Sequence, residues 1–259
     1  MQDKTEFILK PQDNRESTMA KDSLYQSMPT PVPPFEFDDQ VAGVFDDMIH
    51  RSVPFYSEII ERQTQWVERF YQPGTVLYDL GCSNGNLVIR LACRAGAQPY
   101  KIVAVDSSAP MLAAFRKRLA ACPLGKHISL QCEDIRRTVI ENASVVVLNF
   151  TLQFLPPQDR DVLMTRIHNG LARGGILLCC EKITHFNEDM ADLQRSFHHA
   201  FKRENGYSDL EISRKREALE KVLIPESLES HLQRLQRAGF TAMDVWLKWF
   251  NFAALIAVK

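Results

Sequence analysis

Two acidic residues and a glycine-rich turn follow neighbouring apolar runs, where they could bind a ligand. Residues 75–80 (TVLYDL) contain Asp79 and lead directly into the turn GCSNG at 81–85. A second apolar run at 101–105 (KIVAV) is followed by Asp106. Glycines in such a turn let the backbone approach a ligand closely, and a carboxylate can accept hydrogen bonds from both hydroxyls of a ribose. The pattern therefore predicts a site for an adenosine-containing ligand.

The spacing argues against a dinucleotide at this site. A dinucleotide fingerprint has the form GxGxxG, but here Ser83 takes the place of the middle glycine. Asp79 would repel a pyrophosphate, whereas it suits a ligand that carries a cationic sulfonium and an amino-acid group. The structural alternatives are a plain tight turn for the glycines and a favourable acid at a helix N-terminus for Asp106. The glycine turn and Asp106 occur together, at the ends of consecutive apolar runs, and this favours a binding site.

The rest of the chain predicts the elements that position these residues. Strand-like runs at 75–80, 101–105, 128–132, 144–149 and 176–180 alternate with helical stretches at 86–95, 109–121 and 156–171. Such alternation predicts βαβ units and a doubly wound α/β sheet, here of seven strands. The polar residues that end the strands would then lie along one rim, where such sheets bind ligands. The last two runs, around 245–249 and 252–258, have no helix between them and predict an antiparallel C-terminal hairpin.

Three segments lie outside this alternation. Residues 1–35 contain five prolines and little periodicity, and we predict that they form a flexible N-terminal arm. Residues 36–259 are expected to form a single α/β domain. Within it, apolar residues spaced by three and four predict a helical cap at 36–71, and a polar stretch predicts a helical insertion at about 186–233.

Composition and charge exclude several classes of protein. The 259 residues include 31 Lys and Arg against 32 Asp and Glu, so no global positive field favours nucleic acid or a membrane surface. The apolar stretches are far shorter than the roughly 18 residues of a membrane span, and the N-terminus lacks the apolar centre of a signal peptide. The six cysteines form no CxxC pair, and the histidines have no metal-binding spacing. We expect a soluble cytoplasmic protein with no metal, no membrane partner and no direct contact with nucleic acid.

The motif Asp79-x-Gly81-x-Ser83-x-Gly85, with Asp106 27 residues after Asp79, resembles the first two motifs of class I S-adenosyl-L-methionine (SAM) methyltransferases. A narrower resemblance, covering residue 36 to the end, is to the carboxy-S-adenosyl-L-methionine (carboxy-SAM) synthase family. The segments that carry it are MIHRSVPFYSEII, YDLGCSNG, EDIRRTVIENASVVVLNFTLQFL, GGILLCCEK, FKRENGYSDLEISRKREALE and WFNFAALIAVK. The resemblance implies a Rossmann-like class I methyltransferase fold.

The same resemblance implies an activity and partners. It implies a homodimer that converts SAM and prephenate to carboxy-SAM and phenylpyruvate. Carboxy-SAM is the carboxymethyl donor for 5-oxyacetyl-uridine at the tRNA wobble position, so a downstream tRNA carboxymethyltransferase is an implied partner. Two alternatives stay open: a conventional SAM-dependent methyltransferase, and a non-catalytic SAM-binding partner of a tRNA-modifying enzyme.

The resemblance also implies the site residues. The implied cofactor-binding set is Tyr56, Gly81, Cys82, Ser83, Asp106, Ser107, Asp134, Ile135, Asn149 and Arg216. Ser107 departs from the Asn more common in the family. Tyr56 and Asn149 are implied to border the reactive methyl group. Arg216 is implied to clamp the transferred carboxylate, because a planar guanidinium matches a carboxylate and an ordinary methyl group has no use for one. The implied homodimer allows Arg216 to act in the neighbouring subunit's site. On composition alone, the basic segment 195–216 is better interpreted as a solvated helix face, and only the resemblance to the family favours a binding role.

Overall fold

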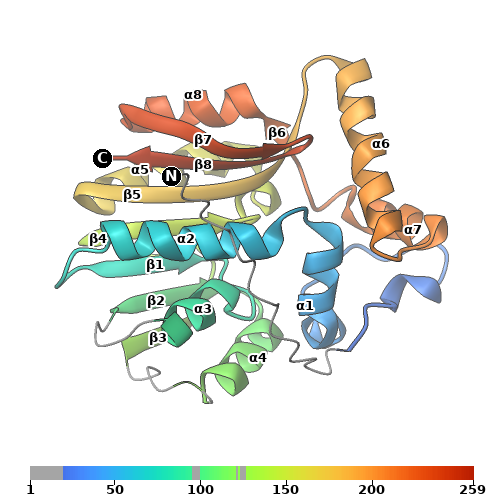
Figure 1. Cartoon of the computed structure of the whole chain (residues 1–259), viewed down its shortest axis with the longest axis horizontal. Coiled ribbons are helices and arrows are strands. Elements are labelled where there is room, and N and C mark those ends of the chain that lie inside the picture. Colours follow the sequence, from blue (N-terminus) through green and yellow to red (C-terminus); the bar gives the residue numbers. More distant parts are fainter. Residues whose placement is uncertain (1–19, 95–99, 121, 123–126) are drawn as a thin grey trace, which may run out of the picture.

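The computed structural model describes residues 20–94, 100–120, 122 and 127–259, and it centres on one twisted sheet with helices on both faces (Figure 1). The strands are β1 (Val76–Leu80), β2 (Ile102–Asp106), β3 (Ile128–Cys132), β4 (Ala143–Asn149), β5 (Leu171–Thr184), β6 (Glu226–Ser227), β7 (Ala242–Trp249) and β8 (Phe252–Val258). Their order is β3-β2-β1-β4-β5-β8-β7, and the short β6 pairs with the end of β5. The predicted doubly wound sheet is confirmed.

The sheet has a parallel part and an antiparallel part. Strands β1 to β5 pair in parallel; helices join them, except that a loop without a helix connects β3 to β4. Strand β8 is antiparallel to both β5 and β7, as predicted for a terminal hairpin. Strand β4 is largely apolar, and its residues 143–148 are all buried because helices cover both faces of the sheet. Strand β5 begins at Leu171, five residues earlier than predicted, because Leu171 already pairs with Ala143 before the bulge in β4.

The helices divide between the two faces of the sheet. Apolar side chains of α2 (Tyr56–Phe70), α3 (Asn86–Arg94) and α4 (Ala109–Leu119) share one hydrophobic cluster with the sheet. Those of α5 (Pro157–Gly170) and α8 (Leu228–Ala238) share the cluster on the opposite face. The two faces are thus covered independently, and the carboxyl ends of the parallel strands remain available for a site.

Three more helices gather beyond those carboxyl ends. Helix α1 (Asp39–Ser52) is capped by the Asp38 side chain and precedes a sharp bend at Phe55, whose φ is 56°. Helices α6 (Glu188–Glu204) and α7 (Asp209–Leu219) form the predicted insertion and stand beside α1 (Figure 1). The predicted insertion extended to 233, but α8 begins inside that range and packs against α5 on the sheet.

Residues 20–35 correct the prediction of a flexible arm over residues 1–35. Tyr25 and Phe35 are buried in a third hydrophobic cluster with Phe45 of α1. The Phe35 N–H donates to the Ala218 carbonyl oxygen at the end of α7, at 3.0 Å. The prolines therefore lie in an ordered strap between α1 and α7, held by aromatic side chains, and the prediction is wrong for residues 20–35. Residues 1–19 lie outside the described residues.

Of the helices in the described part of the chain, none has both the length and the apolar character needed to cross a bilayer.

Candidate active site

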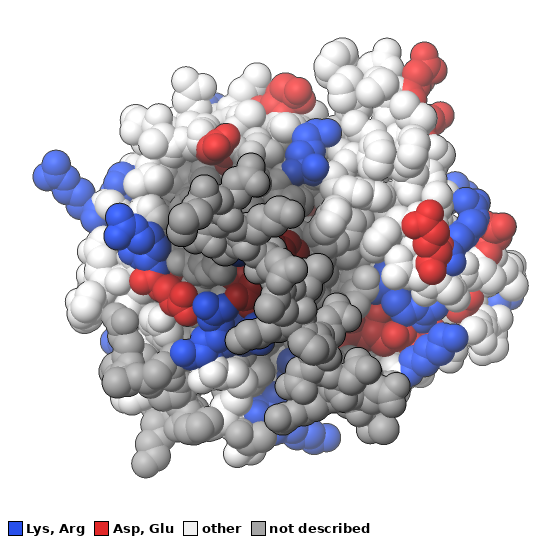
Figure 2. Space-filling view, viewed as in Figure 1, with Lys and Arg blue, Asp and Glu red and all other residues white. Residues whose placement is uncertain are grey.

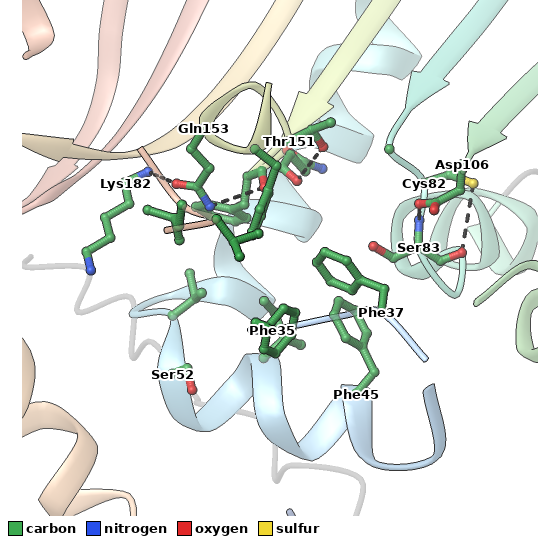
Figure 3. Close-up of a pocket in the computed structure, with 18 of the residues that line it drawn as sticks. Phe35, Phe37, Phe45, Ser52, Cys82, Ser83, Asp106, Thr151, Gln153 and Lys182 are labelled. Carbon is green, nitrogen blue, oxygen red and sulfur yellow. Dashed lines mark hydrogen bonds between the residues drawn. The ribbon is translucent and has the colours of Figure 1, made fainter. Parts of the chain in front are cut away.

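A cavity of about 420 Å³ opens at the carboxyl ends of β1, β2 and β4. Its wall includes side chains from α1, from the start of α2 and from the strap that precedes α1. Figure 3 shows Asp106, Cys82 and Ser83 on one side of the cavity, Lys182 and Ser52 on the other, and aromatic side chains between them. The cavity therefore lies at the rim where a doubly wound sheet binds its ligands.

The turn after β1 depends on its glycine and on Asp106. Gly81 has a φ of +80°, and a Cβ built there would lie 2.2 Å from Thr151 Oγ1, so a larger residue does not fit. The Asp106 carboxylate accepts hydrogen bonds from the N–H groups of Ser83 and Ser108, both at 2.8 Å. Each of its oxygens thus uses one lone pair and retains another that could accept a ligand hydroxyl.

Asp79 lies beside Asp106 in a region of low solvent access. Its side chain is 3% exposed, and no donor among the described residues hydrogen-bonds to it. Burial, with a smaller contribution from the nearby Asp106 charge, raises the pKa of Asp79 to about 7. Burial also raises the pKa of Asp106. One buried and one half-buried acid without a cationic partner make this part of the cavity suitable for a positively charged ligand.

Asp134 and Ile135 lie in the loop after β3, at the same rim. The Asp134 carboxylate is paired with Arg136, whose Nε lies 2.9 Å from Oδ2 and whose backbone N–H donates to Oδ1. This pairing lowers the pKa of Asp134. Ile135 is buried and offers an apolar side chain to the cavity. The two residues therefore provide an acceptor and an apolar surface of the kind that could hold a purine.

Asn149 and Tyr56 border the middle of the cavity, and each is held by a second side chain. The Asn149 amide exchanges two hydrogen bonds with the Gln63 amide, at 2.7 and 2.8 Å. The Tyr56 hydroxyl accepts a hydrogen bond from Asn86 Nδ2 at 3.0 Å. Burial raises the pKa of Tyr56, and burial likewise raises that of the Cys82 thiol. These side chains are therefore uncharged at neutral pH.

Glu181 holds the loop that follows β4. Its side chain is fully buried and accepts hydrogen bonds from three consecutive backbone N–H groups, those of Thr151, Leu152 and Gln153, at 3.1, 2.8 and 3.1 Å. The loop begins with Phe150, whose positive φ of 55° is unusual for a bulky residue. Glu181 therefore supports a strained turn that carries cavity-lining residues.

The structure brings together nine of the ten predicted site residues. Those that line the cavity are Tyr56, Gly81, Cys82, Ser83, Asp106, Ser107, Asp134, Ile135 and Asn149. Arg216 is the exception, since it is exposed on α7 and does not line the cavity of its own chain, whereas its neighbour Lys215 does. Successive residues on a helix point in directions about 100° apart. Arg216 therefore does not enter the cavity of its own chain, and its role in the neighbouring subunit's site stays a prediction.

The cavity-lining residues that were not predicted include three lysines and one histidine. These are Lys182, His198, Lys202 and Lys215, which come from β5, α6 and α7. Lys182 could have been inferred, because it follows an apolar strand as Asp106 does. The other three carry no local signal, since α6 and α7 look like polar surface helices until they are folded against α1.

Among the residues that the structure describes, no group of three or more His, Cys, Asp or Glu side chains could hold a metal ion. His198 and His199 of α6 lie close together, with ring centroids 6.5 Å apart, but the ring of His198 already contacts another residue. His198 Nε2 is 2.8 Å from the Ser52 carbonyl oxygen.

Comparison with known proteins agrees with this geometry. Residues 77–175 match the family model described as a methyltransferase domain. Among solved structures, human N-acetylserotonin methyltransferase in complex with SAM superposes with a TM-score of 0.57 at 15% identity, covering 85% of this chain and 55% of that one. Magnesium protoporphyrin IX methyltransferase from Synechocystis also superposes with a TM-score of 0.57, at 14% identity, covering 81% of this chain and 85% of that one. These likenesses show the class I methyltransferase fold.

Relatives of known name are much closer in sequence. A carboxy-S-adenosyl-L-methionine synthase from Desulforapulum autotrophicum is 51% identical over 241 residues, which cover 93% of this chain and 98% of the relative. A carboxy-S-adenosyl-L-methionine synthase from Shewanella amazonensis is 50% identical over 225 residues, covering 87% and 93%. This chain therefore belongs to the carboxy-S-adenosyl-L-methionine synthase family.

Proposed function

We propose that this protein converts SAM and prephenate to carboxy-SAM and phenylpyruvate. The observation that carries the proposal is the convergence of nine family-implied residues on one cavity, in a chain 51% identical to a carboxy-SAM synthase. The buried Asp79 and the half-buried Asp106 suit the positive charge and the ribose of SAM. Asn149 and Tyr56 border the position assigned to the reactive methyl group.

The reaction needs a base near that methyl group, and the second substrate can supply it. Prephenate loses CO₂ and hydroxide as it becomes phenylpyruvate. The hydroxide takes a proton from the sulfonium methyl group and leaves as water, and the resulting ylide carbon forms a bond to CO₂. The two side chains that border the assigned position, Tyr56 and Asn149, are uncharged, which supports a base from the substrate. The protein's contribution is to position both substrates and to exclude water.

Incubation of the protein with SAM and prephenate, followed by mass spectrometry of the nucleoside products, tests the proposal. A cofactor heavier than SAM by the mass of CO₂, formed together with phenylpyruvate, is the expected result. Formation of S-adenosylhomocysteine with a methylated acceptor would indicate a conventional methyltransferase. Recovery of unchanged SAM from a stable complex would indicate a non-catalytic SAM-binding protein.

We also propose that the protein acts as a homodimer in which Arg216 completes the partner's site. Helix α6 exposes Met190, Leu193 and Phe197, and Phe197 stacks on Phe250 at a centroid distance of 4.3 Å. Figure 2 shows that much of the upper part of α6 carries uncharged side chains. An apolar helix face of this kind favours association with another protein surface. It lies on the same insertion as Arg216.

A complementation experiment tests this arrangement. Asp106→Ala removes a cofactor-binding residue, and Arg216→Ala removes the proposed clamp, so each homodimer should be inactive. A mixed dimer that carries one variant per subunit should regain about half of the specific activity if Arg216 acts across the interface. If Arg216 acts within its own subunit, both sites of this mixed dimer are defective, one at Asp106 and the other at Arg216, and the mixed dimer should be inactive. The decisive control is therefore the dimer of a doubly substituted subunit with wild type, which should be inactive if the clamp acts across the interface.

We further propose that the carboxy-SAM product serves in the cytoplasm as the carboxymethyl donor for tRNA wobble uridine modification. The support is the family membership. Nucleoside analysis of tRNA from cells that lack this gene is expected to show loss of 5-oxyacetyl-uridine. Normal levels of that nucleoside would contradict the proposal.

A further inference from the structure

The cavity has a basic end formed by Lys182, His198, Lys202 and Lys215. Lys182 lies near the end of β5, His198 and Lys202 lie one helical turn apart on α6, and Lys215 lies on α7. His198, Lys202 and Lys215 are 4%, 8% and 5% exposed. In Figure 3 Lys182 lies across the cavity from Asp106. The cavity thus carries acids at one end and amines at the other.

The basic end has little compensating negative charge. In the part of the chain that the structure describes, Asp22 is the carboxylate within ion-pair distance, 3.6 Å from Lys215 Nζ. Asp22 also accepts hydrogen bonds from the Tyr207 hydroxyl and the Leu24 N–H. Lys215 Nζ donates to Ser52 Oγ at 3.1 Å, but no described protein group accepts from the ammonium of Lys182 or Lys202.

The pKa shifts agree with this geometry. Burial, aided by the charges of Lys215 and Lys182, holds the pKa of Lys202 well below its usual range. Burial lowers the pKa of Lys182 to about 8 and that of Lys215 to about 8. An anion bound between these amines would favour their charged forms and relieve their mutual repulsion.

The same protein pairs its buried cations elsewhere. Arg160 is fully buried and forms an ion pair with Glu226. Arg234 has a side chain 6% exposed and pairs with Asp161 at 2.6 Å and with Glu226 at 2.7 Å. Removing a cation from water is costly unless a partner compensates it. Lys182 and Lys202 differ from these structural arginines because their partner is absent from the described protein and they face a ligand-sized cavity.

We infer that the basic end is the subsite for the carboxylate groups of the second substrate, a small organic anion with more than one carboxylate. This inference rests on the proposed function and adds the position of the second substrate. The cationic cofactor occupies the acidic end, the anion occupies the basic end, and Asn149 and Tyr56 lie between them where the two substrates meet. The separation of charge orients both substrates before reaction.

Binding measurements on two variants test the inference. Lys202→Met and Lys182→Met each remove one ammonium and keep an unbranched side chain. Arg203→Met is the matched control, because it removes one exposed charge from the position next to Lys202. Calorimetry would measure affinity for SAM and, with S-adenosylhomocysteine bound as an unreactive cofactor, affinity for prephenate. We expect the two lysine variants to bind SAM within about threefold of wild type and prephenate at least about tenfold more weakly, the loss of one hydrogen bond between charged groups.

Several results would overturn the inference. One is wild-type affinity for prephenate in both lysine variants. Another is a weaker affinity for carboxy-SAM with prephenate affinity unchanged, which would assign the basic end to the carboxylate of the product. A third is a Lys202→Met protein without ligand that melts well below wild type, since removal of a buried amine with no partner among the described protein groups should leave stability equal or higher.

The design separates this inference from the proposed function. If wild-type protein forms carboxy-SAM from prephenate but both lysine variants bind prephenate normally, only the inference fails. If wild-type protein binds prephenate at the lysines without forming carboxy-SAM, the proposed function fails and the anion subsite stands.

Discussion

Asp79 should make cofactor affinity depend on pH near neutrality. In the ligand-free protein, burial and the nearby Asp106 raise the pKa of Asp79 to about 7. A cationic ligand in contact with Asp79 favours its carboxylate form, so the pKa of Asp79 falls when SAM binds. Binding must therefore release the proton that Asp79 carries below pH 7.

The size of the effect follows from proton linkage. With a pKa of about 7 in the free protein and a value below 5 in the complex, the Kd for SAM should rise roughly 25-fold between pH 7.5 and pH 5.5, about 2 kcal/mol. The affinity for SAM should fall as the pH falls. It is highest when Asp79 of the free protein is ionised, and it decreases as Asp79 becomes protonated below pH 7. At pH 7, binding should release about half a proton.

Isothermal titration calorimetry can measure both quantities. Titrations across this pH range give the Kd, and titrations at pH 7 in two buffers of different ionisation enthalpy give the number of protons released. The control is Asp79→Asn, which keeps the side-chain size and should bind SAM with the same low affinity at every pH. If the wild-type affinity for SAM stays constant between pH 5.5 and pH 7.5 and no proton is released, Asp79 does not ionise when SAM binds and the prediction is wrong.

Three other substitutions have defined outcomes. Glu181→Gln should lower the free energy of unfolding in urea by about 1–3 kcal/mol, because an amide cannot accept from all three N–H groups of the loop after β4; unchanged stability would contradict this role. Gln63→Leu leaves the Asn149 amide unpaired, so steady-state kinetics should show a lower kcat with little change in SAM affinity, and an unchanged kcat would count against the pair. Arg216→Ala should weaken carboxy-SAM binding by about 1.5–3 kcal/mol and leave SAM binding largely intact; equal carboxy-SAM affinity would remove Arg216 from the proposed clamp.

The site residues that the sequence predicted best are those whose position follows from both a local motif and the order of the strands. The turn at Gly81–Ser83 and the acid at Asp106 follow neighbouring parallel strands, so the fold alone brings them to one rim. The same reasoning places Asn149 at the end of β4, beside β1. These residues could be predicted because their position depends on strand order, which alternation of strands and helices already indicates.

The remaining site residues depend on packing that no local pattern encodes. Lys202 and Lys215 lie on polar helices, and they face the cavity only because α6 and α7 fold against α1. Arg216 follows Lys215 directly yet points to solvent, a difference of one residue in helix phase. Tyr25 and Phe35 stand among prolines, and their burial depends on the surface that α1 and α7 present to them.

The most direct test of the proposed reaction follows the carbon that prephenate loses as CO₂. Prephenate labelled with ¹³C at that carboxyl group would be incubated with protein and SAM in the presence of unlabelled bicarbonate, and the product examined by mass spectrometry. The proposed reaction predicts that carboxy-SAM carries the label in its new carboxylate, because CO₂ is captured before it leaves the cavity. A carboxy-SAM product without the label, or S-adenosylhomocysteine in its place, would contradict the proposed reaction.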